Sequence, residues 1–160
     1  LNAWCDIIFR FYHKNPSWTA WQTPFFIDCF SGRGMYHKSG KLDSVKGSPI
    51  VAIEKFIEKR KSFEQKFNIS IKPKIRLIEF VPDYAQELES FVKPYSSDID
   101  IKILCGDFND LISSVVKETG YSPTFFFVDA GGIKELKKES VEKIVTKNGA
   151  RDILLNYVVD

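Results

Sequence analysis

Long apolar runs are absent from this sequence. No segment approaches the roughly eighteen uninterrupted apolar residues that a membrane-spanning helix needs. The opening residues, LNAWCDIIFR, have neither the basic head nor the small-residue cleavage site of a signal peptide. We therefore expect a soluble chain without a membrane partner.

Cysteine and histidine are also scarce. Cys5, Cys29 and Cys105 are odd in number and far apart, and the last two lie in apolar, strand-like runs where a thiol packs as a small hydrophobic group. These positions favour core packing over a nucleophilic role, and a reducing, cytoplasmic location. His13 and His37 have no companions at the spacing of metal ligands, so we predict no metal site.

An excess of one charge is missing too. The chain has 23 basic and 21 acidic residues, a net charge of +2, which does not require a polyanionic partner. Its 160 residues, 44% hydrophobic and 14% aromatic, are enough for one domain with its own core. We expect that domain to cover 1–160, with a helix and lead-in at 1–23. Because the chain begins without methionine and ends on the apolar run LLNYVVD, we also expect a piece of a longer protein.

Helical and strand-like patterns alternate along the chain. Apolar residues three and four apart predict a helix over 4–12, and the near-continuous apolar run at 25–30 is typical of a parallel strand covered on both faces. The polar, glycine-rich segment 31–47 predicts a long loop, after which Ser48 and Pro49 predict a capped helix start. Further strands are expected at 75–80, 101–106, 124–132 and 152–160, and further helices at 49–67, 82–93, 107–120 and 134–149.

Strands separated by crossovers of helix length favour parallel pairing with right-handed connections. The pattern therefore predicts an α/β fold. We expect a three-layer, Rossmann-like, doubly wound and mostly parallel sheet of about five strands.

Polar residues follow every expected strand. In an open parallel sheet, ligands bind beyond the carboxyl ends of the strands, near the point where the strand order reverses. Helix caps and turns use the same residue types, so each position also has a purely structural interpretation. The candidates for cofactor binding are Asp28, Ser31, Gly32, Gly34, Glu79, Asp107 and Phe108, and the candidate catalytic residue is Asp129.

Gly32 and Gly34 predict a tight turn that lets a ligand approach main-chain amides. The dinucleotide pattern needs a third glycine, where this chain has His37, and no GKS or GKT follows to make a Walker loop. A nicotinamide-dependent enzyme is therefore a distant alternative.

Three acids have separate expected roles. Glu79 ends the second strand, where a carboxylate accepts hydrogen bonds from both ribose hydroxyls of a nucleoside. Asp107 is placed to accept from an adenine amino group beside Phe108, or else it caps the helix that follows. Asp129 follows the apolar run FFFV, where a carboxylate costs desolvation energy unless it has a task or a partner, so its structural alternative is a salt bridge.

The segment from Arg33 to Lys46 is rich in basic residues and contains Tyr36. This mixture suits contact with a nucleic-acid backbone and stacking on a base. A solvated loop is the plainer alternative.

The segment FIDCFSGRG resembles the cofactor motif of class I S-adenosylmethionine-dependent methyltransferases, in which an apolar strand and an acid precede GxG. Together with KGSPIVAIE, PTFFFVDAGGIKEL and DILLNYVVD, it is similar in order and wording to the three-Cys-motif partner (TcmP) family. That family typically shows DxFAGxG, GSP, FFxDPFG and LxNF at these places. The resemblance covers about four fifths of the chain, 24–160.

This resemblance implies a bacterial or archaeal protein with a methyltransferase-like fold, often encoded beside a cysteine-motif partner protein. We expect it to bind S-adenosylmethionine and to methylate nucleic acid. The turn at Gly32 and Gly34 would hold the methionine part, Glu79 the ribose and Asp107 the adenine, while Asp129 would orient the acceptor.

Two departures from the family pattern keep an alternative open. Residues 129–132 read Asp-Ala-Gly-Gly where the family has Asp-Pro-Phe-Gly, so the aromatic that stacks on a target base is missing. The chain also stops after the fifth expected strand. The alternative is a non-catalytic interaction module with the same fold, working through the partner protein or a nucleic acid.

Overall fold

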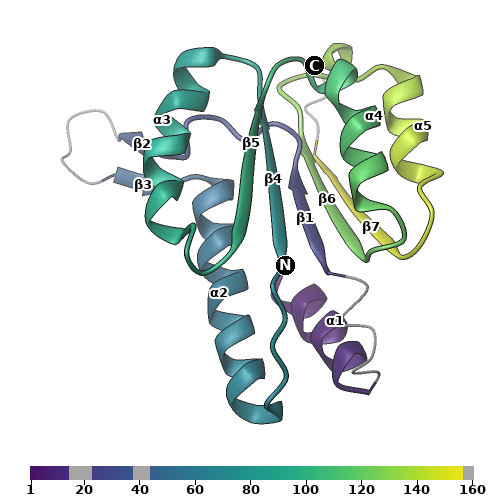
Figure 1. Ribbon diagram of the computed structural model, residues 1–160. Coiled ribbons are helices and arrows are strands. Elements are labelled where there is room, and N and C mark those ends of the chain that lie inside the picture. The colour runs from purple at the N-terminus through teal and green to yellow at the C-terminus, as the bar shows by residue number, and fades with distance from the viewer. Residues whose placement is uncertain (15–22, 38–43, 157–160) are drawn as a thin grey trace.

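The computed structural model describes residues 1–14, 23–37 and 44–156. Five parallel strands form its main sheet, which runs through the middle of the molecule in Figure 1. The strands are β1 (Phe25–Asp28), β4 (Lys74–Glu79), β5 (Asp100–Cys105), β6 (Thr124–Asp129) and β7 (Arg151–Asn156).

The strand order across this sheet is β5-β4-β1-β6-β7. The chain builds outward from β1 to β4 and β5, then returns to the other side of β1 for β6 and β7. The order therefore reverses between β1 and β6. This is the doubly wound, Rossmann-like arrangement predicted from the sequence, and the predicted fold class is confirmed.

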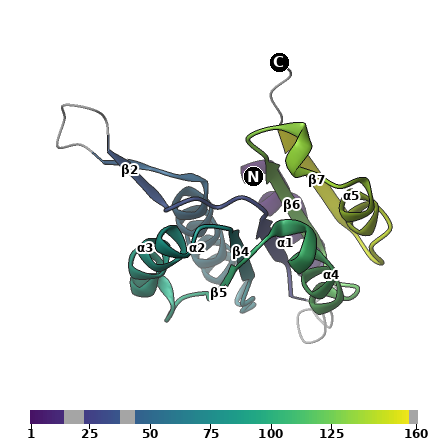
Figure 2. The ribbon, with the colours of Figure 1, turned by 90° about the horizontal axis from the view of Figure 1, so that it is seen from above.

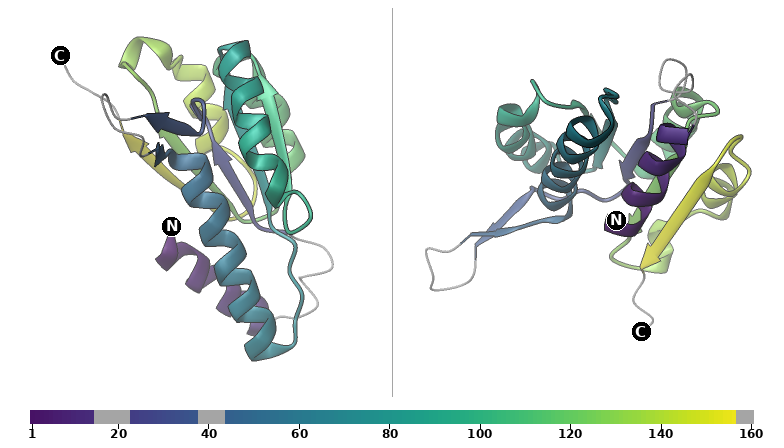
Figure 3. Two further views of the ribbon diagram at one scale, coloured as in Figure 1. Left: turned by 90° about the vertical axis from the view of Figure 1, so that its left-hand side faces the viewer. Right: turned by 90° about the horizontal axis from the view of Figure 1, so that it is seen from below.

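Helices cover both faces of the sheet and make the fold three layers thick (Figure 3). One face packs against α1 (Asn2–Lys14), α2 (Ser48–Phe67) and α3 (Pro82–Val92). The other packs against α4 (Phe108–Thr119) and α5 (Lys138–Val145). Short 3-10 helices, η2 (Lys93–Tyr95) and η3 (Ile133–Glu135), follow α3 and precede α5.

All four residues of the central strand β1 are buried, because each face of this strand lies under a helix layer. Phe26 belongs to the core under α1, α2 and α3, whereas Phe25 and Ile27 belong to the core under α4 and α5. A strand buried on both sides has no polar face to alternate with its apolar one. The continuous apolar run in the sequence reflects this placement.

The segment expected to be a long loop contains an antiparallel hairpin instead. Strands β2 (Met35–His37) and β3 (Ser44–Lys46) pair with each other and project from the body of the domain, as seen from above in Figure 2. The amide of Gly47 donates to the carbonyl of Gly34 at 2.7 Å and closes the base of the hairpin. Two strands of three residues are too short to give a periodic pattern, so the sequence signal was that of a loop.

Three local expectations need correction. Ser48 does not cap α2: it is the first helical residue, Gly47 occupies the cap position, and the Ser48 hydroxyl is bonded elsewhere. Cys29 is buried as expected, but Cys105 is exposed, because β5 is an edge strand of the sheet. The helix expected over 134–149 is shorter, since η3 occupies its start and α5 runs only from Lys138 to Val145.

None of the helices within the described ranges combines the length and the apolar character needed to cross a membrane.

Candidate functional site

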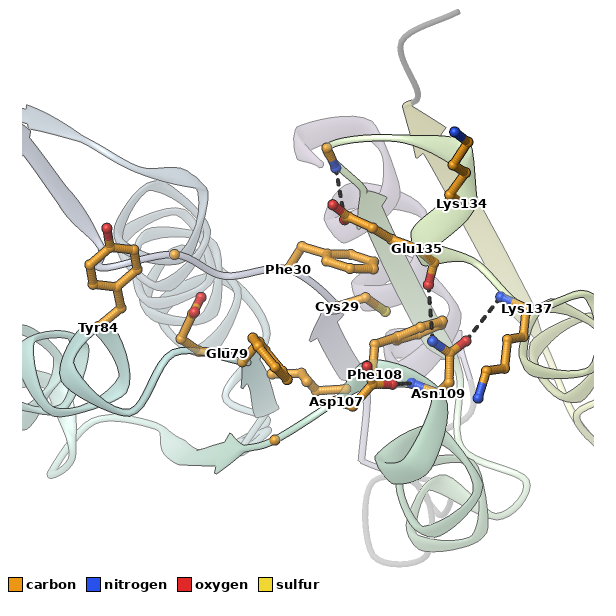
Figure 4. A pocket seen from close by; sticks show the side chains of 15 residues that line it. Cys29, Phe30, Glu79, Tyr84, Asp107, Phe108, Asn109, Lys134, Glu135 and Lys137 are labelled. Atoms are coloured by element: carbon orange, nitrogen blue, oxygen red, sulfur yellow. Dashed lines mark hydrogen bonds between the residues drawn. The ribbon is translucent and has the colours of Figure 1, made fainter.

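A cavity of about 740 Å³ opens at the carboxyl edge of the sheet. Its walls come from the residues that follow β1, β4, β5 and β6, and from the starts of α3 and α4. Figure 4 shows Glu79 and Tyr84 on one side of the cavity and Lys134, Glu135 and Lys137 on the other. The cavity therefore lies where a doubly wound sheet binds its ligands.

Half of the predicted site residues line this cavity. Gly32, Glu79, Asp107 and Phe108 belong to its wall. Asp28, Ser31, Gly34 and Asp129 are not among the lining residues.

The two glycines of the turn adopt backbone conformations that side chains disfavour. Gly32 has a φ of +64°, and a Cβ there would collide with the hydroxyl of Tyr36. Gly34 has a φ of +83°, and a Cβ there would lie 2.7 Å from Cδ1 of Leu88. The turn therefore requires glycine at both positions, but only Gly32 faces the cavity.

Glu79 is nearly buried at the end of β4, with 7% of its surface exposed. Its Oε1 accepts a hydrogen bond of 2.8 Å from the amide of Val81, just before α3. The side chain nevertheless lines the cavity, so its second oxygen remains for a ligand in the described structure.

Asp107 caps a helix, which was its structural alternative, and it also lies in the cavity wall. Its Oδ1 accepts from the amide of Asn109 at 2.7 Å and so caps α4. The residue also lines the cavity. The next residue, Phe108, is largely buried and its ring packs 5.2 Å from that of Phe30, which also lines the cavity.

Asp28 lies deeper in the sheet than the other strand-end acids. It pairs in register with Leu77 and Phe127, which are two residues before Glu79 and Asp129 on the neighbouring strands. Two strand residues correspond to about 7 Å. Asp28 is therefore completely buried instead of standing at the sheet edge.

The carboxylate of Asp28 has partners within the protein. Its Oδ2 accepts from the Ser48 hydroxyl at 2.7 Å, and its Oδ1 from the amide of Phe30 at 3.2 Å. Burial raises the pKa of Asp28 to about 7, and the charges of Asp129 and Glu79 add to this rise, while the two hydrogen bonds oppose it. Ser31 is also buried: its hydroxyl donates to the carbonyl of Asp28.

Ser48 is the first residue of α2, so a carboxyl group already stands at the N-terminus of this helix. Dinucleotide-binding folds place the pyrophosphate of the ligand at the corresponding helix terminus. The position of Asp28 therefore disfavours a pyrophosphate here and weakens the nicotinamide alternative further.

Replacement of Asp28 by asparagine should change how stability depends on pH. A raised pKa in the folded state means that the contribution of Asp28 to stability is fullest below about pH 4 and declines as the pH rises toward about 7. Asp28→Asn removes this decline. The free energy of unfolding of the variant, relative to wild type, should therefore rise by about 2 kcal/mol as the pH is raised from 5 to 8. Urea unfolding at the two pH values measures the gain. Asp83→Asn, at an exposed position on α3, controls for the loss of one negative charge. A difference in unfolding free energy between Asp28→Asn and wild type that is the same at both pH values would contradict the prediction.

Asp129 is exposed at the end of β6 and lies outside the cavity wall. Its Oδ1 accepts from Nδ2 of Asn156 on β7 at 2.8 Å. The partner is thus an amide and not the cation that the salt-bridge alternative assumed.

Several residues of the cavity wall were not predicted from the sequence. Phe30, Phe80, Tyr84, Asn109, Lys134, Glu135 and Lys137 all line the wall. Tyr84 lies in α3, and the guanidinium of Arg33 stacks on its ring at 4.1 Å while pairing with Glu87 at 3.7 Å. The one available signal was proximity to a strand end, which Phe30, Phe80 and Asn109 share. Lys134 and Glu135 lie in the quoted segment PTFFFVDAGGIKEL, but no residue-type pattern marked them as site residues, and no motif contains Tyr84 or Lys137.

The basic segment from Arg33 to Lys46 is only partly described. Arg33 is engaged with Tyr84 and Glu87, and Lys46 pairs with Glu54 at 2.7 Å. The other lysines of the segment, Lys38 and Lys41, lie outside the described residues. Within the described ranges, no cluster of three histidine, cysteine or acidic side chains is arranged to hold a metal ion.

A scan of the chain against protein-family models gave no match, and a search of curated proteins gave no significant match either. The resemblance to the TcmP family therefore stays a prediction from short motifs.

Proposed function

We propose that this chain binds S-adenosylmethionine in the 740 Å³ cavity and serves as a methyltransferase-like protein. The observation that carries the proposal is the placement of two acids. Glu79 ends β4, Asp107 follows the neighbouring strand β5, and both line one cavity beside the glycine at position 32. Carboxylates after two neighbouring strands of a sheet edge suit the ribose hydroxyls and the amino group of an adenosine.

The charge of the cavity supports a ligand of this kind. The acids Glu79, Asp107 and Glu135 line it against the lysines Lys134 and Lys137. S-adenosylmethionine carries a sulfonium and an ammonium group and has no phosphate, so it tolerates an acidic wall. A dinucleotide would bring two negative charges to the same wall and to the buried carboxyl of Asp28.

Methyl transfer from a sulfonium makes modest demands on the protein. The acceptor's lone pair forms the bond to the methyl carbon while the carbon–sulfur electron pair returns to sulfur. In-line positioning of the acceptor supplies most of the rate, so this reaction does not require a dedicated acid–base pair.

Calorimetric titration with S-adenosylmethionine and S-adenosylhomocysteine tests the proposal. We expect a micromolar Kd for the wild type and a Kd raised about a hundredfold in the double variant Glu79→Gln, Asp107→Asn. These amides keep the oxygens that accept from Val81 and Asn109, so the bond just before α3 and the cap of α4 are retained. NAD serves as the ligand control.

The matched control is the double variant Glu89→Gln, Asp110→Asn, which removes the same charges from exposed positions on α3 and α4. It should bind as the wild type does. Failure of the wild type to bind either sulfur nucleoside would refute the proposal, and undiminished binding by the Glu79, Asp107 variant would refute the assignment of the site.

The placement of Asp129 favours a second candidate function. The expected catalytic acid is exposed, bonded to Asn156 and outside the cavity wall. A module that binds the cofactor without transferring its methyl group, and acts through a protein or nucleic-acid partner, fits this placement. Tritium transfer from labelled S-adenosylmethionine to DNA, RNA and protein distinguishes the enzyme from the module.

A further inference from the structure

The loop between β6 and α5 forms one wall of the cavity. Gly131, Lys134, Glu135 and Lys137 of this loop all line it. The loop is braced internally, because the amide of Gly131 donates to Oε2 of Glu135 at 3.1 Å and the amide of Glu135 to the carbonyl of Gly132 at 3.1 Å. These bonds hold the loop in shape but do not fix its distance from the opposite wall.

Asn109, in the first turn of α4, connects this loop to the rest of the site. Its Nδ2 donates to the carbonyl of Glu135 at 2.9 Å, and its Oδ1 accepts from the amide of Lys137 at 3.0 Å. Both bonds are drawn in Figure 4. These two bonds join the segment 131–137 to α4, while the carbonyl of Lys137 accepts from the amides of Ser140 and Val141 in α5.

The main chain of Asn109 is bonded to Asp107, the residue that the proposed function assigns to the adenine. Its own amide donates to Oδ1 of Asp107 at 2.7 Å. One residue therefore touches both the acid assigned to adenine and the loop that forms the facing wall. A change at Asn109 would alter the spacing between them.

We propose that Asn109 is a positioning residue, which fixes loop 131–137 relative to Asp107 and so sets the affinity of the cavity for its adenosine ligand. The affinity part rests on the proposed function, whereas the fixing of the loop does not.

Only an asparagine side chain meets this requirement at its length, because it presents one donor and one acceptor in a single plane. An aspartate keeps the acceptor for Lys137 but turns a second oxygen toward the carbonyl of Glu135. An alanine loses both bonds. Protonation of the aspartate near pH 4 restores a donor, which gives the variant a pH dependence that a general loss of stability would not produce.

Hydrogen exchange followed by mass spectrometry tests the fixing of the loop without any ligand. In Asn109→Ala, we expect exchange of the 131–137 segment to accelerate about tenfold at neutral pH. In Asn109→Asp, the acceleration should be present at pH 7 and reduced at pH 4. Asn148→Asp, an exposed site before β7 at the other end of the sheet, makes the same chemical change and should leave the segment unaltered.

Titration with S-adenosylhomocysteine tests the effect on affinity. The Kd should rise about tenfold in Asn109→Ala and in Asn109→Asp, and stay at the wild-type value in Asn148→Asp. If Asn109→Ala proves unfolded by circular dichroism, Asn109→Asp decides the matter, because its side chain keeps the bond to Lys137.

The outcomes separate this inference from the proposed function. Unchanged exchange of 131–137 in the alanine variant overturns the inference whether or not the protein binds the nucleoside. Accelerated exchange with an unchanged Kd overturns its affinity part. Absence of binding by the wild type overturns the proposed function and the affinity part together, while the exchange rates still decide whether Asn109 fixes the loop.

Discussion

Replacement of Gly149 by alanine should destabilise the fold by about 4 kcal/mol. Gly149 precedes β7 and has a φ of +79°, a conformation that costs an ordinary residue about 1–2 kcal/mol. A Cβ at this position would also collide with the carbonyl oxygen of Tyr121 and lie 2.9 Å from its Cα. These are main-chain atoms between α4 and β6, so no side-chain rotation relieves the contact.

Gly120 provides the matched control for this prediction. It also has a positive φ, +51°, but a Cβ there meets no heavy atom within 4 Å. Gly120→Ala should therefore cost only the conformational part, about 1 kcal/mol. Urea unfolding of both variants measures the difference, and equal losses would show that the close approach of the two turns is unimportant.

Removal of the Arg76 side chain should cost about 3 kcal/mol. Arg76 lies in β4 with its side chain only 4% exposed. Its Nε and Nη2 donate to Glu118 of α4 at 3.0 and 2.6 Å, and its Nη1 donates to Asp100 of β5 at 3.1 Å. One buried guanidinium thus joins the sheet edge to the helix above it. Arg76→Ala loses these bonds and leaves a void.

Two comparisons identify the cause of that loss. Arg76→Met fills most of the void and leaves the partly exposed acids to water, so it should be less destabilising than Arg76→Ala. The hydrogen bond from Arg76 lowers the pKa of Glu118, so the pair contributes stability above about pH 4 and loses it as the pH falls further. The gap between wild type and Arg76→Ala in urea unfolding should therefore narrow at acid pH. A gap that is constant with pH would assign the effect to packing alone.

The fold followed from the sequence because its main signals are local. Each strand lies between segments of helix length, and β1 is apolar throughout since helices cover both of its faces. The hairpin β2–β3 did not follow, because three residues a strand give no periodicity and its closing bond joins two glycines.

The site was harder to predict because the sequence does not reveal strand register, which decides how far each strand-end residue lies from the sheet edge. Asp28, Glu79 and Asp129 look alike there: each ends an apolar run. In the structure, Asp28 stands beside Leu77 and is buried, Glu79 lines the cavity, and Asp129 is exposed. Lys134, Glu135 and Lys137 reach the cavity through a loop whose course depends on Asn109, a contact between residues distant in sequence.

The central position of β1 also governs the order in which the protein can assemble. Phe25 pairs with Lys74 on one side and with Thr124 on the other, so a growing chain gains the second neighbour only after α2, β4, α3, β5 and α4 have been made. Until then the run FFID has one edge of unpaired main-chain groups next to two phenylalanine rings. The strand that carries the candidate ligand turn is thus the first strand of the main sheet to be made but gains its second neighbour only when β6 is complete, and the nascent chain is exposed to aggregation during that interval.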